Sequence, residues 1–345
     1  MKTNFLAAGF VFISVMLPLK ASAAKFTGFY IFGDSLADTG NIFNVTSNLL
    51  QPPIPTPPSP PYFQGRFAND LIWVDYLGDE LGLKPTLVTD ILLNNAIPTQ
   101  GINFATGGSN SGFGNAIAPN APLPGVLEQV IGFVQGNGNF VDPNALYAVV
   151  GGANDYLFPQ IPSDPNQPKP YTNIFQSVNN LVTAGAKNIV VFNLPDLGVL
   201  PGSNLPTRNP VDLTKVTQEF NFNLAKDLAT IRQNPDINLI EVNVYSLVNS
   251  WRQSPDKFGF TNTTDACLQF TSPTTYITCN NPQEYLFWDN IHPSSQAHKL
   301  IADAVFVPEP STAMGIFGLG AVATLVQKGK SKKAKGKSNK VAIES

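Results

Sequence analysis

Along most of the 345-residue chain, short runs of β-branched and aromatic residues alternate with stretches whose apolar positions recur at helical spacing. This alternation is typical of βαβ units and predicts about five strands. We expect strands in 25–33, 101–108 and 145–152 and in the second halves of 174–198 and 213–247, with helices in 68–82, in the first halves of the last two segments and in 294–306. The predicted fold is α/β, a parallel sheet with helices on both faces.

One segment breaks this pattern. Residues 51–67 read QPPIPTPPSPPYFQGRF. Proline lacks a backbone donor and disrupts helices and central strands. We therefore predict an extended excursion over the surface.

The two ends of the chain differ from the body. Lys2, an apolar stretch over 5–19 and Ala21-Ser22-Ala23 form the pattern of a secretory signal peptide, residues 1–23. The apolar stretch is short for a membrane span of roughly 20 residues, so cleavage is favoured over anchoring. At the other end, 307–345 holds Val307-Pro308-Glu309-Pro310, a Gly- and Ala-rich apolar run and a lysine-rich tail. The body is then 24–306.

Composition and charge exclude several classes of protein. Hydrophobic residues make up 43% and charged residues 13%, which supplies a core and excludes disorder of the whole chain. The net charge of −3, with lysines concentrated in the tail, argues against nucleic acid as a partner. In an oxidising compartment Cys267 and Cys279 are expected to form a disulfide. Two cysteines so placed and two histidines cannot build a metal site, and no cofactor is expected.

Polar and glycine residues follow several predicted strands. They are Ser35, Gly107 with Gly108, Asn154 with Asp155, and Asp196. In parallel α/β sheets, ligands bind outside the carboxyl ends of the strands. We therefore expect these residues to converge on one rim of the sheet.

A serine at such a rim attacks a carbonyl group only when a base takes its proton, and the usual base is histidine. His292 lies three residues after Asp289 in FWDNIHPSS, whereas His298 lies inside the following predicted helix. An aspartate in that position can hold the ring nitrogen that faces away from the serine. A helix-capping turn before Pro293 is the alternative for Asp289 and His292, and for His298 a structural role is favoured.

Attack on an ester also requires donors for the growing negative charge, commonly backbone N–H groups and an amide side chain. Gly107 or Gly108 offers a backbone N–H, and Asn154 offers an amide. Paired glycines can serve a turn alone and Asn-Asp can cap a helix, so it is the joint occurrence that indicates chemistry. The aromatic residues expected along the cleft are Phe43, Tyr62, Phe63, Tyr156 and Phe158, with core packing as the alternative for each.

Four blocks, FGDSLADTGN, GINFATGGS, GGAND and DNIHPS, occur in the order of the sequence blocks of GDSL, or SGNH, esterases and lipases. The chain resembles this family over about Phe29 to His298, and GRFAND, FNLPDLG and PDKFGF resemble the branch with plant GDSL lipases and bacterial lipase-acyltransferases. The resemblance implies a flavodoxin-like three-layer sandwich, Ser35 as nucleophile, Asp289 and His292 as its triad partners, and the N–H groups of Ser35 and Gly108 with the Asn154 side chain as oxyanion donors.

The C-terminal segment resembles the PEP-CTERM sorting signal of exported bacterial proteins, with lysines where arginines are more usual. This resemblance implies a tail held transiently in the membrane and removed by a sortase-like protease, which places the protein at the cell surface or outside the cell. Since the chain contains no G-x-S-x-G elbow, the other common serine esterase fold has no nucleophile candidate. The predicted function is a metal-free carboxylic ester hydrolase acting on a lipid or an acylated saccharide. A carbohydrate O-deacetylase and a non-catalytic surface module are the alternatives.

Overall fold

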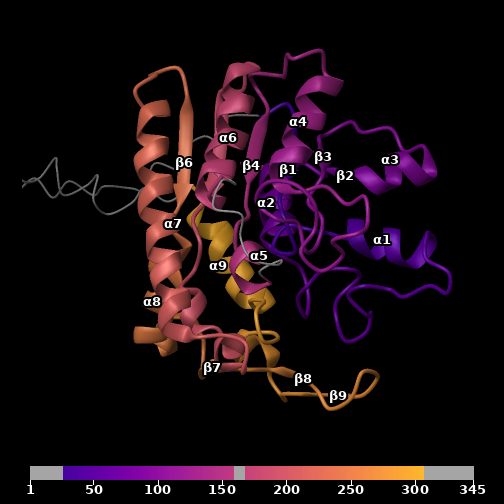
Figure 1. Cartoon of the computed structure of the whole chain (residues 1–345), viewed down its shortest axis with the longest axis vertical. Coiled ribbons are helices and arrows are strands. Elements are labelled where there is room, and N and C mark those ends of the chain that lie inside the picture. Colours follow the sequence, from indigo (N-terminus) through magenta and orange to yellow (C-terminus); the bar gives the residue numbers. More distant parts are fainter. Residues whose placement is uncertain (1–25, 159–167, 307–345) are drawn as a thin grey trace, which may run out of the picture.

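The computed structural model describes residues 26–158 and 168–306 (Figure 1). Its centre is a six-stranded parallel sheet in the order β2-β3-β1-β4-β5-β6. The strands are β1 (Phe29–Phe32), β2 (Thr86–Leu87), β3 (Ile102–Asn103), β4 (Leu146–Val149), β5 (Asn188–Phe192) and β6 (Asn238–Val242). The predicted α/β class is confirmed, and β2 is an edge strand that the sequence pattern did not indicate.

The strand order determines where a site can form. Without β2, the order is β3-β1-β4-β5-β6, which is the flavodoxin-like arrangement. The chain leaves β1 for β3 on one side and later returns to β4 on the other side. A crevice therefore opens at the carboxyl end of β1, at the switch point of the sheet.

Helices cover both faces of the sheet (Figure 1). Side chains alternate along β1, so that Phe29 lies 6.3 Å from the ring of Trp73 in α2 while Tyr30 lies 5.0 Å from the ring of Phe133 in α4. The helix α2 packs on α9, and α6 packs between α4 and α7. The helices are α1 (Asn41–Asn48), α2 (Trp73–Leu81), α3 (Val88–Asn94), α4 (Val126–Gly136), α5 (Asn154–Leu157), α6 (Pro170–Thr183), α7 (Pro210–Ile231), α8 (Val244–Gln253) and α9 (Ser295–Ala304).

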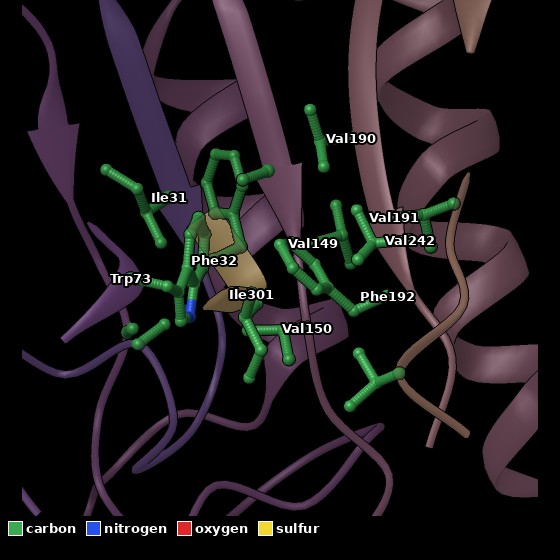
Figure 2. Packing of buried hydrophobic residues seen from close by; sticks show 14 of the residues in the cluster. Ile31, Phe32, Trp73, Val149, Val150, Val190, Val191, Phe192, Val242 and Ile301 are labelled. Carbon is green, nitrogen blue, oxygen red and sulfur yellow. The ribbon is translucent and has the colours of Figure 1, made fainter. Parts of the chain in front are cut away.

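The central strands are buried on both faces, as expected of a parallel sheet. Every residue of β4 is buried, and so are the last four of β5. Figure 2 shows side chains of β1, β4 and β5 packed with Trp73 of α2 and Ile301 of α9. This rigid centre holds the loops that follow the strands.

The proline-rich segment 51–67 contains neither helix nor strand, as predicted. The prediction that it runs over the surface is wrong for its second half, because Tyr62 and Phe67 are only 9% and 7% exposed. Their rings lie edge to face, 6.2 Å apart. The segment therefore returns to the body and contributes side chains to its interior.

A small strand region follows α8. Here β7 (Asn262–Ala266) pairs in parallel with β10 (Tyr285–Phe287), and β8 (Leu268–Phe270) pairs with β9 (Tyr276–Thr278) as an antiparallel hairpin. A disulfide joins Cys267 and Cys279 at the base of this hairpin. The hairpin projects from the lower edge of the molecule in Figure 1.

Candidate active site

Ser35 lies in a tight turn directly after β1. The Asp34 carboxylate accepts the N–H of Leu36 at 3.0 Å, and the Asp34 carbonyl accepts the N–H of Ala37 at 3.0 Å. A Cβ atom at Gly33 would lie 2.6 Å from Val150 Cγ1, so the chain needs glycine where it leaves the strand. The turn presents a nearly buried Ser35, which is 9% exposed.

The sequence-predicted base and acid lie beside this serine. His292 Nε2 is 2.9 Å from Ser35 Oγ, and His292 Nδ1 is 2.7 Å from Asp289 Oδ2. The other oxygen of Asp289 accepts the N–H groups of Ile291 and His292, each at 2.8 Å. The ring of Phe67 lies 4.9 Å from the imidazole and helps to fix its plane. Ser35, His292 and Asp289 therefore form one continuous row of hydrogen bonds.

Sequence reasoning missed a fourth member of this row. The hydroxyl of Tyr62 donates to Asp289 Oδ2 at 2.6 Å, the same oxygen that faces His292. Tyr62 comes from the proline-rich segment, 227 residues away in the chain. Burial and the charge of Asp289 raise the pKa of Tyr62, so the phenol stays protonated and remains a donor. Tyr62 therefore holds the carboxylate of Asp289 by a hydrogen bond, whereas its sequence context indicated only an aromatic ring along the cleft.

The two glycines after β3 have different surroundings. The carboxylate of Asp38 accepts the N–H of Gly107 at 2.8 Å, together with the N–H groups of Gly40, Asn41 and Ile42. Gly108 has φ of +82°, and a Cβ atom there would lie 2.3 Å from Ile117 Cγ1. Both the conformation and the space thus require glycine at 108. Asp38 ties the loop after β1 to the loop after β3.

Asn154 is the first residue of α5 and is buried. Its Nδ2 donates to the carbonyl of Ser109 at 2.9 Å and lies 3.5 Å from Asp34 Oδ2. The amide is thus fixed between the loop after β1 and the loop after β3.

Asp196, which the strand-end rule also placed at this rim, serves another purpose. Its Oδ1 accepts the N–H of Gly198 at 2.9 Å and the hydroxyl of Thr214 at 2.7 Å. It caps a short turn after β5 and joins that turn to α7. Asp155 likewise accepts the N–H and the hydroxyl of Ser111. The carboxylates of Asp155 and Asp196 therefore stabilise the loops around the site by hydrogen bonds.

Burial sets the charges around Ser35. Burial alone would raise the pKa of Asp289, but the charge of His292 and the hydrogen bonds from His292 and Tyr62 outweigh it, so the pKa lies below its usual value. Burial raises the pKa of Asp34 to about 6. Burial lowers the pKa of His298 to about 3, so this histidine is neutral, and its Nδ1 has no hydrogen-bond partner. Its place inside α9 agrees with the structural role favoured from the sequence.

Within 26–158 and 168–306, no group of three or more His, Cys, Asp or Glu side chains is placed to hold a metal ion. No helix in this part of the chain has both the length and the apolar character needed to span a membrane. The signal peptide predicted for 1–23 and the sorting tail predicted for 307–345 lie outside the described residues.

The family model for GDSL-like lipase/acylhydrolases matches residues 29–305. The chain belongs to this family. The model of the PEP-CTERM protein-sorting motif matches residues 306–328, directly after the hydrolase body. Both resemblances noted in the sequence are thereby confirmed.

Three relatives of this GDSL hydrolase are similar over most of the chain. A GDSL esterase/lipase of Arabidopsis thaliana is 28% identical over 340 residues, covering 85% of this chain and 91% of the relative. The thermolabile hemolysin of Vibrio parahaemolyticus is 27% identical, covering 79% of this chain and 61% of the relative. The phosphatidylcholine-sterol acyltransferase of Aeromonas hydrophila is 25% identical, covering 84% and 92%. The chain is a carboxylic ester hydrolase of this family.

Proposed function

We propose that this GDSL hydrolase cleaves carboxylic esters through an acyl-enzyme formed on Ser35. The row from Ser35 through His292 to Asp289, with separations of 2.9 Å and 2.7 Å, is the observation that carries the proposal. A nucleophile, a base within hydrogen-bond reach and a third group that orients the base are the parts that such catalysis needs.

In the first half of the reaction, Ser35 Oγ bonds to the ester carbonyl carbon and its proton passes to His292 Nε2. The bond from that carbon to the alcohol oxygen then breaks, and His292 returns the proton to the departing alcohol. In the second half, water attacks the acyl-enzyme and gives its proton to His292. The carboxylic acid leaves and Ser35 regains its proton. Asp289 stays ionised throughout and stabilises the imidazolium, in keeping with its lowered pKa.

Negative charge on the carbonyl oxygen is met, in this proposal, by the N–H groups of Ser35 and Gly108 and by the amide of Asn154. Gly107 is a weaker candidate than Gly108 because its N–H already donates to Asp38 at 2.8 Å. Asn154 is held by the Ser109 carbonyl, which fixes the direction of its amide before a substrate arrives. Donors fixed in advance stabilise a transition state without the cost of reorganisation.

We also propose that the enzyme works outside the cytoplasm. A signal peptide over 1–23 would start export, and the PEP-CTERM motif would hold the tail in the membrane until a sortase-like protease removes it. The disulfide between Cys267 and Cys279 suits an oxidising compartment. The motif points to sorting toward the cell surface.

The test compares the full-length chain with its Ser35→Ala variant on p-nitrophenyl esters from acetyl to palmitoyl. Because the row acts as a unit, turnover should fall roughly 10³-fold or more in the variant, while the circular dichroism spectrum stays unchanged. Equal turnover in both proteins would refute the acyl-enzyme. Ser35-dependent activity confined to acetyl esters would instead favour a carbohydrate O-deacetylase.

A further inference from the structure

A cavity of about 60 Å³ adjoins Ser35 on the inner side of the site. Ser35, Asn154 and His292 form one part of its lining. From there it extends inward between the sheet and the helices α8 and α9, so one end of the cavity touches the proposed reacting atoms and the other lies in the core.

Beyond Ser35, Asn154 and His292, the lining is mostly apolar, although the polar side chains of Asp34 and Asn193 also belong to it. It includes Trp73, Phe192, Val248, Leu286 and Ile301. Figure 2 shows three of these, Trp73 of α2, Phe192 of β5 and Ile301 of α9, within one cluster of packed side chains. The one histidine in the inner lining is His298, whose ring is uncharged. A charged or strongly polar group would lose its hydration there, whereas a hydrocarbon would not.

We infer that this cavity binds the acyl group of the substrate and restricts the enzyme to short acyl chains, of about three or four carbons. The inference rests on the proposed function, since it takes Ser35 as the atom that carries the acyl group. An apolar cavity of about 150 Å³ accommodates benzene, so 60 Å³ offers space for roughly two or three carbon atoms beyond the carbonyl carbon.

The order of events favours the acyl group over the alcohol as the occupant. The acyl group stays bonded to Ser35 while the alcohol leaves and water enters. A cavity that runs from Ser35 toward the core suits the part that stays bonded to the enzyme, whereas the alcohol and the water must exchange with solvent. The acyl carbon chain also starts at the atom that Ser35 attacks, next to the end of the cavity that Ser35 lines.

Val248 offers a way to change the space without touching Ser35, His292 or Asn154. It is buried on α8 and lines the cavity. Val248→Ala removes two carbon atoms from the wall and Val248→Leu adds one. Val178 on α6 is also buried but is not part of the lining, so Val178→Ala is the matched control.

The experiment measures kcat/KM of the full-length chain and these variants on p-nitrophenyl acetate, propionate, butyrate, hexanoate and octanoate, with circular dichroism as the check on folding. We expect a maximum at propionate or butyrate and a loss of about tenfold or more at octanoate, since a methylene group that fits or fails to fit changes discrimination by that order. Val248→Ala should raise the hexanoate-to-butyrate ratio about tenfold, Val248→Leu should lower the butyrate-to-acetate ratio, and Val178→Ala should leave both ratios unchanged.

Ser35-dependent hydrolysis that is fastest on octanoate, or acyl ratios that are the same in both Val248 variants and the parent, would overturn the acyl cavity while leaving the proposed function intact. Hydrolysis that does not depend on Ser35 would instead remove the proposed function and the cavity's role together. If Val248→Ala does not fold, the parent profile and Val248→Leu still decide the matter.

Discussion

The hydroxyl of Tyr62 and the imidazole of His292 meet at one atom, Asp289 Oδ2, at 2.6 Å and 2.7 Å. The carboxylate oxygen that faces the imidazole is therefore itself fixed from a second direction. Tyr62 is buried and packs edge to face on Trp288, with the ring centroids 6.2 Å apart. We interpret Tyr62 as a positioning residue for Asp289.

Tyr62→Phe removes this hydrogen bond and keeps the ring. A hydrogen bond to a charged group contributes about 1.5–3 kcal/mol, so kcat should fall roughly ten- to a hundredfold if that contribution is made in the transition state, with KM little changed. Steady-state kinetics on a soluble ester is the measurement. The low-field proton resonance of His292 Nδ1–H should also move, because the carboxylate loses one of its donors. Tyr76→Phe is the control, since it also loses a tyrosine hydroxyl bond, that to Ser295 Oγ at 2.8 Å. Equal losses of kcat in both variants would assign Tyr62 to stability alone.

Asn154→Ala separates an oxyanion donor from a structural cap. Loss of one such donor costs on the order of 10² to 10³ in kcat. Asn173→Ala is the comparison, because Asn173 is also buried and its amide donates to Ser111 Oγ at 3.0 Å. Turnover and thermal unfolding should be measured on both. An Asn154 variant that loses melting temperature but keeps its kcat would contradict the donor role.

The buried carboxyl of Asp34 predicts a dependence of stability on pH. Its pKa in the folded chain is raised to about 6 by burial, against about 3.9 when unfolded. Between these pH values the folded state binds more protons at Asp34 than the unfolded state does. The contribution of protonated Asp34 to the free energy of unfolding is therefore present below pH 4 and is lost as the pH rises through 6. Asp34→Asn removes this loss, and its free energy of unfolding relative to the parent should increase by up to about 3 kcal/mol between pH 4 and pH 7. Urea unfolding across this range is the measurement. A difference that stays constant with pH would show that Asp34 is ionised throughout.

Reduction of the disulfide should lower the free energy of unfolding by about 2 to 3 kcal/mol, as expected for a short loop. Activity should fall as well, because Cys267 packs in one buried cluster with Tyr62 and Trp288. The chain has two cysteines, so the Cys267→Ser/Cys279→Ser double variant should have the stability of the reduced protein. Adding reductant should not change the free energy of unfolding of this variant. Chemical unfolding with and without dithiothreitol tests this, and two titratable thiols in the exported protein would show that the bond does not form.

Much of the sheet could be predicted because each of its central strands is a continuous apolar run with a turn after it. The strands β1 and β4 lie within the predicted segments 25–33 and 145–152, and each is shorter than its segment. The strand β2 could not be found this way, since it has two residues and neither is buried. Its pairing with β3 depends on the rest of the sheet being in place.

The Ser35–His292–Asp289 row was predictable for a different reason. The candidates for the nucleophile are restricted to residues that directly follow a strand. The chain has just two histidines, and one of them has an aspartate three residues before it. Tyr62 had no comparable local sign. Its hydrogen-bond partner Asp289 is 227 residues away in the chain. The prolines around Tyr62 prevent a regular helix or strand, so no hydrophobic periodicity shows which side chains face inward. The cavity beyond Ser35 is lined by side chains from α2, β5, α8 and α9 together, so it cannot be predicted from any single segment of the sequence.

Ser35 and His292 stand 257 positions apart, close to the two ends of the hydrolase body. A ribosome produces the serine just after the first strand, but almost the whole body must follow before it produces the imidazole of His292. On the proposed mechanism, a half-made or truncated polypeptide therefore carries a serine hydroxyl without its base. For a cell whose own membranes are built of esters, the proposed mechanism would thus delay ester hydrolysis until synthesis and folding are complete.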